Sequence, residues 1–503
     1  MPDASGNTAY DSLEARFRRI ALVGEAGAVL HWDYATQMPE GGAESRADQL
    51  AELQAISHTL LTSVETEDQI AAAQDSAASL DEWQAANLRE MSRRVRRARA
   101  LDEAFVTKFA KACSATEQAW RRARAESDFA VVGTLLAELT ELVREKAVRI
   151  GEVLALDPYD ALLDAYEPGG RAAKIDPVFD DLAKFLPPFL EEVLAHQAKE
   201  PAALAPKGPF PEATQRDLGV KFMEILGFDF SRGRIDVSHH PFCGGVPDDV
   251  RITTRYDEDD FTSALMGVLH ETGHALYSQG LPADWRLQPV GDALGMSIHE
   301  SQSLLMEMQV CRSRAFLAFA APVMRETFGG KGPAWETDNL IRLYHKVERS
   351  FIRVDADEIT YPLHIILRYR LERAILAGDL QIKDLPTAWN DTFKSLIGLD
   401  VPDDANGCLQ DIHWFDGAFG YFPTYTLGAM TAAQLYQAAK SQDAAIPSGI
   451  EKGDFAPLLA WLRENVHSLG RRLPATDLLT ETTGRPLEAA PFKNHLRARY
   501  LGV

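Results

Sequence analysis

The sequence predicts a mainly helical protein, built as one continuous body around a groove, with a small β element. Most of the 503 residues follow a helical pattern, with apolar positions three and four apart. The convincing β signal is confined to residues 231–260, where short runs with Val, Ile and Thr are separated by glycines. Internal repeats and low-complexity tracts are not evident. We therefore expect a single catalytic domain over residues 1–503, with the β element against the helix that carries the candidate metal site.

The first part of the chain reads as a series of amphipathic helices. Residues 12–61 alternate apolar and charged positions, and a turn at residues 38–46 divides them into two helices. Long helices are also expected in residues 81–124 and 131–156, which are rich in Ala, Glu and Arg. Within the first of these lies the basic cluster RRVRRARA, residues 93–100. We interpret it as a solvated helix face whose arginines pair with nearby acids.

The middle of the chain changes from helices to the β element and back. Helical patterns cover residues 175–199 and 214–229, on either side of a proline-rich connector at residues 201–213. The β element then follows, as a small hairpin or sheet. From residue 261 to the end, helical patterning dominates again.

Composition and charge exclude several classes of partner. The formal net charge of -22 argues against nucleic acid or an anionic membrane, because neutralising phosphates needs clustered Lys and Arg. No apolar run reaches the roughly 18 residues that span a bilayer. The first twenty residues lack a basic segment followed by an apolar core. The four cysteines are far apart, which predicts neither disulfides nor a thiolate zinc site. We expect a cytoplasmic protein.

A candidate metal site lies in residues 261–280, FTSALMGVLHETGHALYSQG, which read as a buried helix. Residues four apart lie on one face of a helix, so the imidazoles of His270 and His274 can meet one tetrahedral metal ion. Glu271 lies beside them, where its carboxylate can take a proton from a water in the open coordination position. The pattern predicts a zinc-dependent peptidase with one metal ion per chain.

A third protein ligand is needed, because a catalytic zinc takes three side chains and a water. The spacing that would supply a later histidine places Tyr277 and Gly280 at its positions, which excludes that class of site. We favour Glu300, early in the following helix. His299 competes for this role, but neighbours in a helix point about 100° apart, so only one of them can face the metal. We expect His299 to support the ligands or to contact substrate.

The chain resembles the carboxypeptidase Taq family of metallocarboxypeptidases in six motifs. They are HPF at residues 240–242, DVRIT at 249–253, HETGH at 270–274, HESQS at 299–303, IRVDAD at 352–357 and GCLQDIHW at 407–414. Three further stretches are similar to the family: HWDYATQMPEGGAESRADQL, YDALLDAYEPG and TGRPLEAAPFKNHLRARY. The similarity therefore covers nearly the whole chain.

The resemblance implies a large, saddle-like helical body around a deep active-site groove, and a homodimer. It also implies that single residues are removed from the C-terminus of peptides of broad sequence, with C-terminal proline disfavoured. Zinc is the metal that the resemblance implies, with cobalt able to support activity.

A tetrahedral oxyanion needs a hydrogen-bond donor besides the metal. Tyr421 and Tyr425, in the segment FDGAFGYFPTYTLG, are candidates, and we favour Tyr421. His240 and His413 are further candidates. For each of the four, a core tyrosine or histidine with a satisfied hydrogen bond is the competing interpretation.

An enzyme that acts at the C-terminus must recognise a free carboxylate, which a planar guanidinium matches well. The segment KVERSFIRVDADE carries Arg349 and Arg353, four apart and hence expected on one helical face. The resemblance of IRVDAD to a family motif favours Arg353 as the anchor. The competing interpretation is a helix face on which these arginines pair with neighbouring acids.

These observations predict a zinc metallocarboxypeptidase that acts on peptides. One alternative is an oligopeptidase or dipeptidyl carboxypeptidase on a similar helical scaffold, with the same metal site and a different position for the carboxylate anchor. The alternative from another class is a helical binding protein that keeps a metal ion without catalysis.

Overall fold

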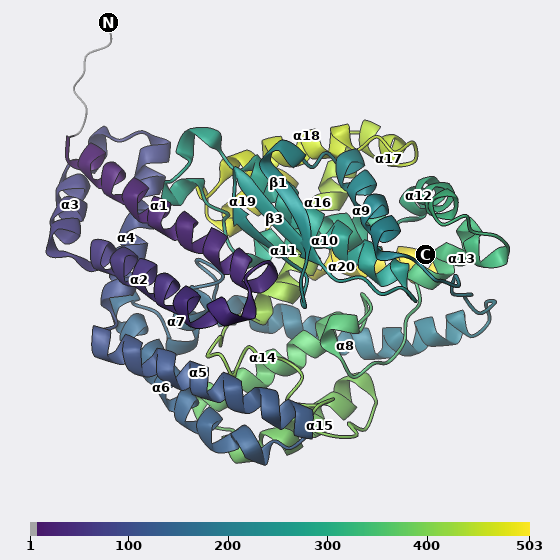
Figure 1. Cartoon of the computed structure of the whole chain (residues 1–503), viewed down its shortest axis with the longest axis horizontal. Helices are drawn as coiled ribbons and strands as arrows, with labels where there is room; N and C mark the ends of the chain where they lie inside the picture. Colours follow the sequence, from purple (N-terminus) through teal and green to yellow (C-terminus); the bar gives the residue numbers. More distant parts are fainter. Residues whose placement is uncertain (1–7) are drawn as a thin grey trace, which may run out of the picture.

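Helices dominate the computed structural model, as the sequence predicted (Figure 1). The structure describes residues 8–503, so the first seven residues of the expected domain lie outside it, as does the start of the N-terminal segment used to predict location. All four cysteines are free thiols. Within the described part of the chain, no helix is both long enough and apolar enough to cross a membrane.

The N-terminal helices form a layer with a small core of its own. The layer consists of α1 (Thr8–Thr36), α2 (Ala43–Thr62), α3 (Val64–Asp75) and α4 (Glu82–Arg99). The side chain of Asp81 begins α4 by accepting a hydrogen bond from the backbone N–H of Gln84 at 2.8 Å. The core residues of the layer are Tyr10, Leu13, Phe17, Ile70, Ala73, Leu88, Met91 and Val95. In contrast, α2 has no buried residue.

The basic cluster on α4 pairs with acids, which confirms its interpretation as a charged helix face. Arg93 forms ion pairs with Glu90 on its own helix and with Asp164. Other arginines of the cluster pair with Asp292 and Glu67. These pairs connect α4 to segments far away in the sequence.

A second group of helices leads from this layer to the sheet. The group consists of α5 (Glu103–Glu126), α6 (Ala130–Leu154), α7 (Pro158–Leu163), α8 (Ala172–Gln197) and α9 (Glu212–Leu226). The long helix expected over residues 81–124 is divided into α4 and α5 by a break at residues 100–102, and α5 packs on α6. The proline-rich connector forms no regular element before α9 begins.

The β signal of residues 231–260 corresponds to a three-stranded sheet. Its strands are β1 (Gly233–Val237), β2 (Phe242–Val246) and β3 (Asp249–Thr254), in the order β1-β3-β2. Strands β2 and β3 form an antiparallel hairpin, with Cys243 opposite Ile252. Strand β1 pairs with β3 in parallel, with Ile235 opposite Ile252. The central strand packs against the metal helix, as expected.

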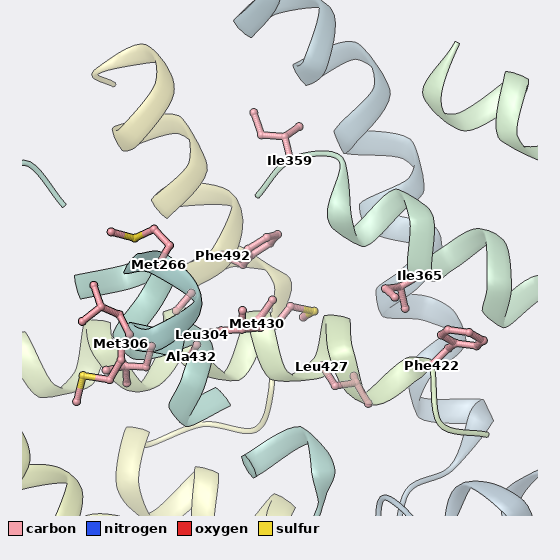
Figure 2. Close-up of a cluster of buried hydrophobic side chains, with 14 of the residues drawn as sticks. Met266, Leu304, Met306, Ile359, Ile365, Phe422, Leu427, Met430, Ala432 and Phe492 are labelled. Atoms are coloured by element: carbon pink, nitrogen blue, oxygen red, sulfur yellow. The ribbon is translucent and has the colours of Figure 1, made fainter. Parts of the chain in front are cut away.

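The helices that follow the sheet surround the main core. They are α10 (Phe261–Gly280), α11 (Met296–Leu304), α12 (Arg314–Thr327), α13 (Thr337–Tyr344), α14 (Tyr361–Ala377), α15 (Leu385–Ile397), α16 (Pro423–Gln442), α17 (Ala445–Ile450), α18 (Ala456–Asn465), α19 (Ala475–Thr483) and α20 (Ala489–Leu501). A π-helical turn, Leu305–Cys311, continues α11. Figure 2 shows part of the core, where Met266 of α10, Met430 of α16 and Phe492 of α20 are buried together. This core holds α10, α11 and α16 as the rigid frame of the candidate site.

Candidate metal centre

Helix α10 presents His270, Glu271 and His274 from its middle. It begins after Asp260, whose carboxylate accepts a hydrogen bond from the backbone N–H of Thr262 at 2.8 Å. Its observed bounds, Phe261–Gly280, agree with the predicted helix. The spacing of four residues places the two imidazole rings 5.0 Å apart between centroids. Two metal-binding groups thus face one point in space.

Glu300 of α11 completes a cluster of three side chains. Its Oε2 atom lies 3.4 Å from Nε2 of His274 and 4.0 Å from Nε2 of His270. One candidate ligand atom from each of the three residues lies within 4.8 Å of the other two. Two imidazole nitrogens and one carboxylate oxygen at this spacing suit a zinc ion with an open fourth position.

Two glycines allow the helices to approach closely enough to form this cluster. A Cβ atom on Gly273 would lie 2.4 Å from the carbonyl oxygen of Gln302 on α11. A Cβ atom on Gly428 of α16 would lie 2.8 Å from Cβ of Glu300. Both contacts are too short for any side chain, so the glycine inside HETGH is explained by helix packing.

The Nδ1 atoms of both histidines are held by acceptors outside the cluster. Nδ1 of His270 lies 2.9 Å from Oε2 of Glu307, and Nδ1 of His274 lies 3.0 Å from the carbonyl oxygen of His299. Because a carboxylate and a carbonyl can only accept, each Nδ1 carries the proton. In a neutral ring, Nε2 then has a lone pair for a metal ion. Burial lowers the pKa of His270, but Glu307, Glu300 and Glu271 raise it to about 10, so a metal ion would displace a proton from this ring.

Glu271 is a buried acid with one carboxylate oxygen that has no hydrogen-bond partner among the described residues. Its side chain is 7% exposed, and its Oε2 atom is buried without a hydrogen-bond partner among residues 8–503. Burial raises the pKa of this carboxyl above its usual value, although the two histidines oppose the shift. An orphaned buried oxygen is costly, and it fits a site that holds a metal ion and a water beside it.

His299 supports the histidine pair from the neighbouring position on α11. Its Nδ1 atom lies 2.6 Å from Nδ1 of His274. This contact leaves the Nε2 atom of His274 to face the candidate metal position. Burial lowers the pKa of His299 to about 3, so its ring is neutral and can accept a hydrogen bond. The ring also lines the cavity around the cluster. The contact with His274 fits the predicted role of His299 in supporting a metal ligand. Because its ring lines the cavity, His299 could also contact a substrate.

A cavity of about 790 Å³ opens over the cluster. We call its region around His270, His274 and Glu300 the metal end, and its region around Arg353 the anchor end. Residues that line it include Phe242, Cys243, Glu271, His299, Glu307, Tyr361, Tyr421 and Tyr425. The cavity therefore connects the metal cluster with a guanidinium group.

Arg353 is held rigidly at the anchor end. Its Nε and Nη2 atoms donate to Oδ1 of Asp411 at 3.0 and 2.8 Å, and its backbone N–H donates to Gln410. Asp411 also pairs with the fully buried Arg368. Burial alone would raise the pKa of Asp411, but the two guanidinium groups hold it well below its usual range. Within residues 8–503, Nη1 of Arg353 makes no hydrogen bond.

Tyr421, Tyr425 and His413 form one cluster, and Tyr425 packs on Arg353. The ring of Tyr425 lies 4.8 Å from Cζ of the guanidinium, and the rings of Tyr421 and Tyr425 are 5.2 Å apart between centroids. His413 lies behind them, with Nε2 3.2 Å from the Tyr425 hydroxyl oxygen. Burial lowers the pKa of His413 to about 4. Both tyrosines line the cavity, whereas His413 contacts it through Tyr425.

The helix expected to carry Arg349 and Arg353 together is not formed, so that prediction was wrong. Helix α13 ends at Tyr344, and Arg353 lies in a single 3-10 turn, Arg353–Asp355. The carboxylate of Asp357 accepts hydrogen bonds from the backbone N–H groups of Glu348, Ile359 and Thr360. Local acceptors of this kind compete with helical hydrogen bonds. Arg349 pairs with Glu191 of α8 and does not line the cavity.

His240 lies away from the cavity, in contrast to its predicted role. Its side chain is exposed, and its carbonyl oxygen accepts hydrogen bonds from Ser238 and Thr253. The following residues of the same motif, Pro241 and Phe242, line the cavity instead. A bend before β2 turns the histidine outward.

Two supporting acids were not identified from the sequence. Glu307 lies in the π-helical turn after α11, a geometry that is frequent at functional sites. Asp411 lies inside GCLQDIHW and was not given a role. Glu307 is an acid within the apolar run LLMEMQV, and this signal would have found it. No comparable signal marks Asp411, because GCLQDIHW also contains Gln and His.

Comparisons with known proteins agree on one family. The profile of the carboxypeptidase Taq (M32) metallopeptidase family matches residues 12–500. Thermostable carboxypeptidase 1 of Thermus thermophilus is 38% identical over 98% of this chain and 99% of its own length. Carboxypeptidase 1 of Bacillus subtilis is 35% identical over 96% of both chains. The structure of Trypanosoma cruzi metallocarboxypeptidase 1 matches with a TM-score of 0.96 and 40% identity, over 98% of this chain and 100% of the other.

Proposed function

Since the chain belongs to the carboxypeptidase Taq (M32) metallopeptidase family, we propose that it releases single C-terminal amino acids from peptides with one zinc ion per chain. Membership of this family makes it a peptide-hydrolysing exopeptidase that depends on a metal. The observation that carries the finer proposal is the single cavity that joins the metal cluster to Arg353. We further propose a broad specificity in which C-terminal proline is disfavoured, as the sequence resemblance implies.

His270, His274 and Glu300 would hold the metal ion. Two neutral imidazoles and one carboxylate are a donor set typical of catalytic zinc, and they leave one position open. When bound, the ion supplies Lewis acidity, which lowers the pKa of a water and polarises the scissile carbonyl. Cobalt accepts the same donors, so we expect it to replace zinc.

Glu271 would act as the general base and then as the general acid. Its buried, unpartnered oxygen is available to accept the proton of the attacking water. The raised pKa of the carboxyl favours holding that proton until it passes to the leaving amine. The nearby tyrosines would donate a hydrogen bond to the developing oxyanion, and we favour Tyr421, with Tyr425 as the second candidate.

Arg353 would bind the terminal carboxylate of the peptide. Asp411 occupies its Nε and Nη2 atoms, which leaves Nη1 for a ligand in the cavity. A guanidinium that is already fixed loses little freedom on binding, so its contact with a carboxylate is strong. This anchor would limit cleavage to the last peptide bond.

Mass spectrometry of an N-terminally blocked peptide tests the proposal. The protein is incubated with the peptide before and after chelation, and again after zinc or cobalt is restored. We expect a ladder that loses one C-terminal residue at a time, stops with chelator and resumes with metal. Loss of two residues per step or internal cuts would favour the oligopeptidase alternative. No cleavage by the metal-loaded protein would favour the binding-protein alternative.

Assembly and location stay predictions. A homodimer rests on the family resemblance, and light scattering of the purified protein tests it. A cytoplasmic location agrees with four free cysteines, because disulfides are rare in reducing compartments. Cell fractionation tests that prediction.

A further inference from the structure

The segment YDALLDAYEPG, residues 159–169, holds the start of α11 from outside that helix. The backbone carbonyl oxygen of Tyr166 accepts a hydrogen bond from the N–H of Met296 at 2.7 Å. Oε2 of Glu167 accepts a hydrogen bond from the backbone N–H of Ser297 at 3.1 Å. These two donors belong to the first two residues of α11, which is the helix that supplies the carboxylate of the metal cluster. The segment itself does not line the cavity.

This end of α11 depends on an acceptor that its own N-cap does not provide. The N-cap is Gly295, which has no side chain to accept the free N–H groups of the first turn. Glu167 is 7% exposed, and its carboxyl group lies at the positive end of the helix. A Cβ atom on Gly295 would lie 3.1 Å from Cδ of Pro168, so glycine lets the segment approach closely. Glu300 lies less than one turn after Ser297, within direct reach of this cap.

The same segment contacts the loop that supplies Tyr421. The ring of Tyr166 meets the ring of Tyr421 edge to face, with 4.9 Å between their centroids. A Cβ atom on Gly420 would lie 2.8 Å from the backbone nitrogen of Leu163, so the chain just before Tyr421 lies directly against the segment. Residues 166 and 167 therefore connect α11 with the loop of the favoured oxyanion donor.

Another acid of the segment makes the same kind of contact with a different helix. Oδ1 of Asp160 accepts a hydrogen bond from the backbone N–H of Ala172, the first residue of α8, at 2.7 Å. Asp160 is 6% exposed, so its burial matches that of Glu167. Within the described residues, α8 supplies none of the groups that form the metal cluster or line its cavity. Asp160 therefore caps a helix that has no part in the site.

We propose that residues 166 and 167 are positioning residues, which fix the candidate metal ligand Glu300 and the favoured oxyanion donor Tyr421 relative to one another. This inference rests on the proposed function, which gives Glu300 and Tyr421 their roles. Glu167 fixes the first turn of α11 and hence the place of the Glu300 carboxylate beside the two histidines. The ring of Tyr166 fixes the side chain of Tyr421. Both residues act through the groups that they hold, because neither lines the cavity.

Competition with a chelator of known affinity tests the role of Glu167 without any activity assay. Glu167→Ala removes the acceptor of the Ser297 N–H, so zinc affinity should fall about ten-fold, a loss typical of groups that orient a metal ligand. Glu167→Gln keeps a carbonyl oxygen that can accept the same hydrogen bond, so its affinity should stay within about three-fold of the unmodified protein.

Asp160→Ala is the matched control, because it also removes a buried cap from the start of a helix. It should leave zinc affinity unchanged. One cap contributes a small part of the stability of a protein, so both alanine variants should fold.

Steady-state kinetics on an N-terminally blocked peptide test the role of Tyr166. Tyr166→Ala should lower kcat about ten-fold, because an oxyanion donor acts on the transition state. Its KM and zinc affinity should stay within about two-fold of the unmodified values. Tyr166→Phe keeps the ring that contacts Tyr421, so its kcat should also stay within about two-fold.

Two results on zinc binding would overturn the proposal: unchanged affinity in Glu167→Ala, or an equal loss in Asp160→Ala. Two results on kinetics would also overturn it: unchanged kcat in Tyr166→Ala, or an equal loss in Tyr166→Phe. If the unmodified, zinc-loaded protein cleaves no peptide, the proposed function fails instead. The zinc affinities then still decide whether Glu167 positions Glu300.

Discussion

The metal end and the anchor end of the cavity are built in different ways. At the metal end, two consecutive helices supply the cluster, because His270 and His274 on α10 meet Glu300 on α11. At the anchor end, Arg353 in a single 3-10 turn meets Asp411, which lies outside any helix. Helical periodicity can therefore specify a metal cluster, whereas the charged anchor depends on segments that the rest of the protein holds in place.

The two ends also differ in charge. The metal end gathers three carboxylates, Glu271, Glu300 and Glu307, around two histidines. At the anchor end, Arg353 and Arg368 share the carboxylate of Asp411, so two positive charges face one negative charge within this cluster. Glu348, Asp355 and Asp357 also line the cavity. A cation is favoured at the first end and an anion at the second. This difference would orient a peptide with its terminal carboxylate toward Arg353.

The largest effect is expected from Glu271→Gln at the metal end. The amide cannot accept a proton, so kcat/KM should fall on the order of 10³-fold while the metal cluster stays intact. Rates on a blocked peptide and the zinc content of the purified variant provide the measurement. Activity within ten-fold of the unmodified protein, at full zinc content, would remove Glu271 from the mechanism.

Arg353→Ala should reduce activity at the anchor end on the order of 10²-fold, because a buried charged hydrogen bond to the substrate is lost. The loss should appear for peptides with a free C-terminal carboxylate and be nearly absent for the slower C-terminal amides. Arg349→Ala is the matched control, since Arg349 pairs with Glu191 outside the cavity. Equal losses on acids and amides would refute the anchor.

Glu307→Gln should weaken metal binding about 10- to 100-fold, because the carboxylate that orients His270 is replaced by a weaker acceptor. Competition with a chelator of known affinity measures this change without any activity assay. Glu326→Gln, on the exposed side of α12, is a control that should leave the affinity unchanged. An unaltered metal affinity in Glu307→Gln would show that α10 and α11 orient the histidine by packing alone.

Asp411→Asn should have the smallest effect on activity, about three- to ten-fold in kcat/KM, because Arg353 keeps a neutral acceptor. Its effect on stability should depend on pH. The pKa of Asp411 is lowered in the folded protein, so its stabilisation is present above the unfolded value of about 3.9 and is lost as the pH falls through the folded value.

Thermal unfolding of the metal-free protein and the variant, followed from neutral to acidic pH, checks this prediction. The difference between their melting temperatures should be largest near neutrality and should shrink below about pH 4. A difference that is independent of pH would mean that the carboxylate stabilises the anchor end by shape and hydrogen bonding rather than by charge.

Sequence reasoning succeeded where the governing interactions are local. The bounds of α10 agree with the prediction because a helical pattern is a property of a short segment. The Asp260 cap, which the prediction did not use, is equally local. Sequence reasoning failed for residues 346–358, which do not form the expected helix. There Asp357 accepts a backbone N–H, and Gln410 binds a backbone N–H and a backbone carbonyl. Their positions could not be inferred from helical spacing.

The sequence by itself determined the fold class, the small β element and the helical spacing that brings His270 and His274 together. These features depend on backbone geometry and on hydrogen bonds between residues close in the chain. Only the tertiary structure decided that Glu307 holds His270, that Asp411 holds Arg353, and that His240 turns away. Each of these outcomes depends on where distant segments pack, because a buried charge is stable only where a partner meets it.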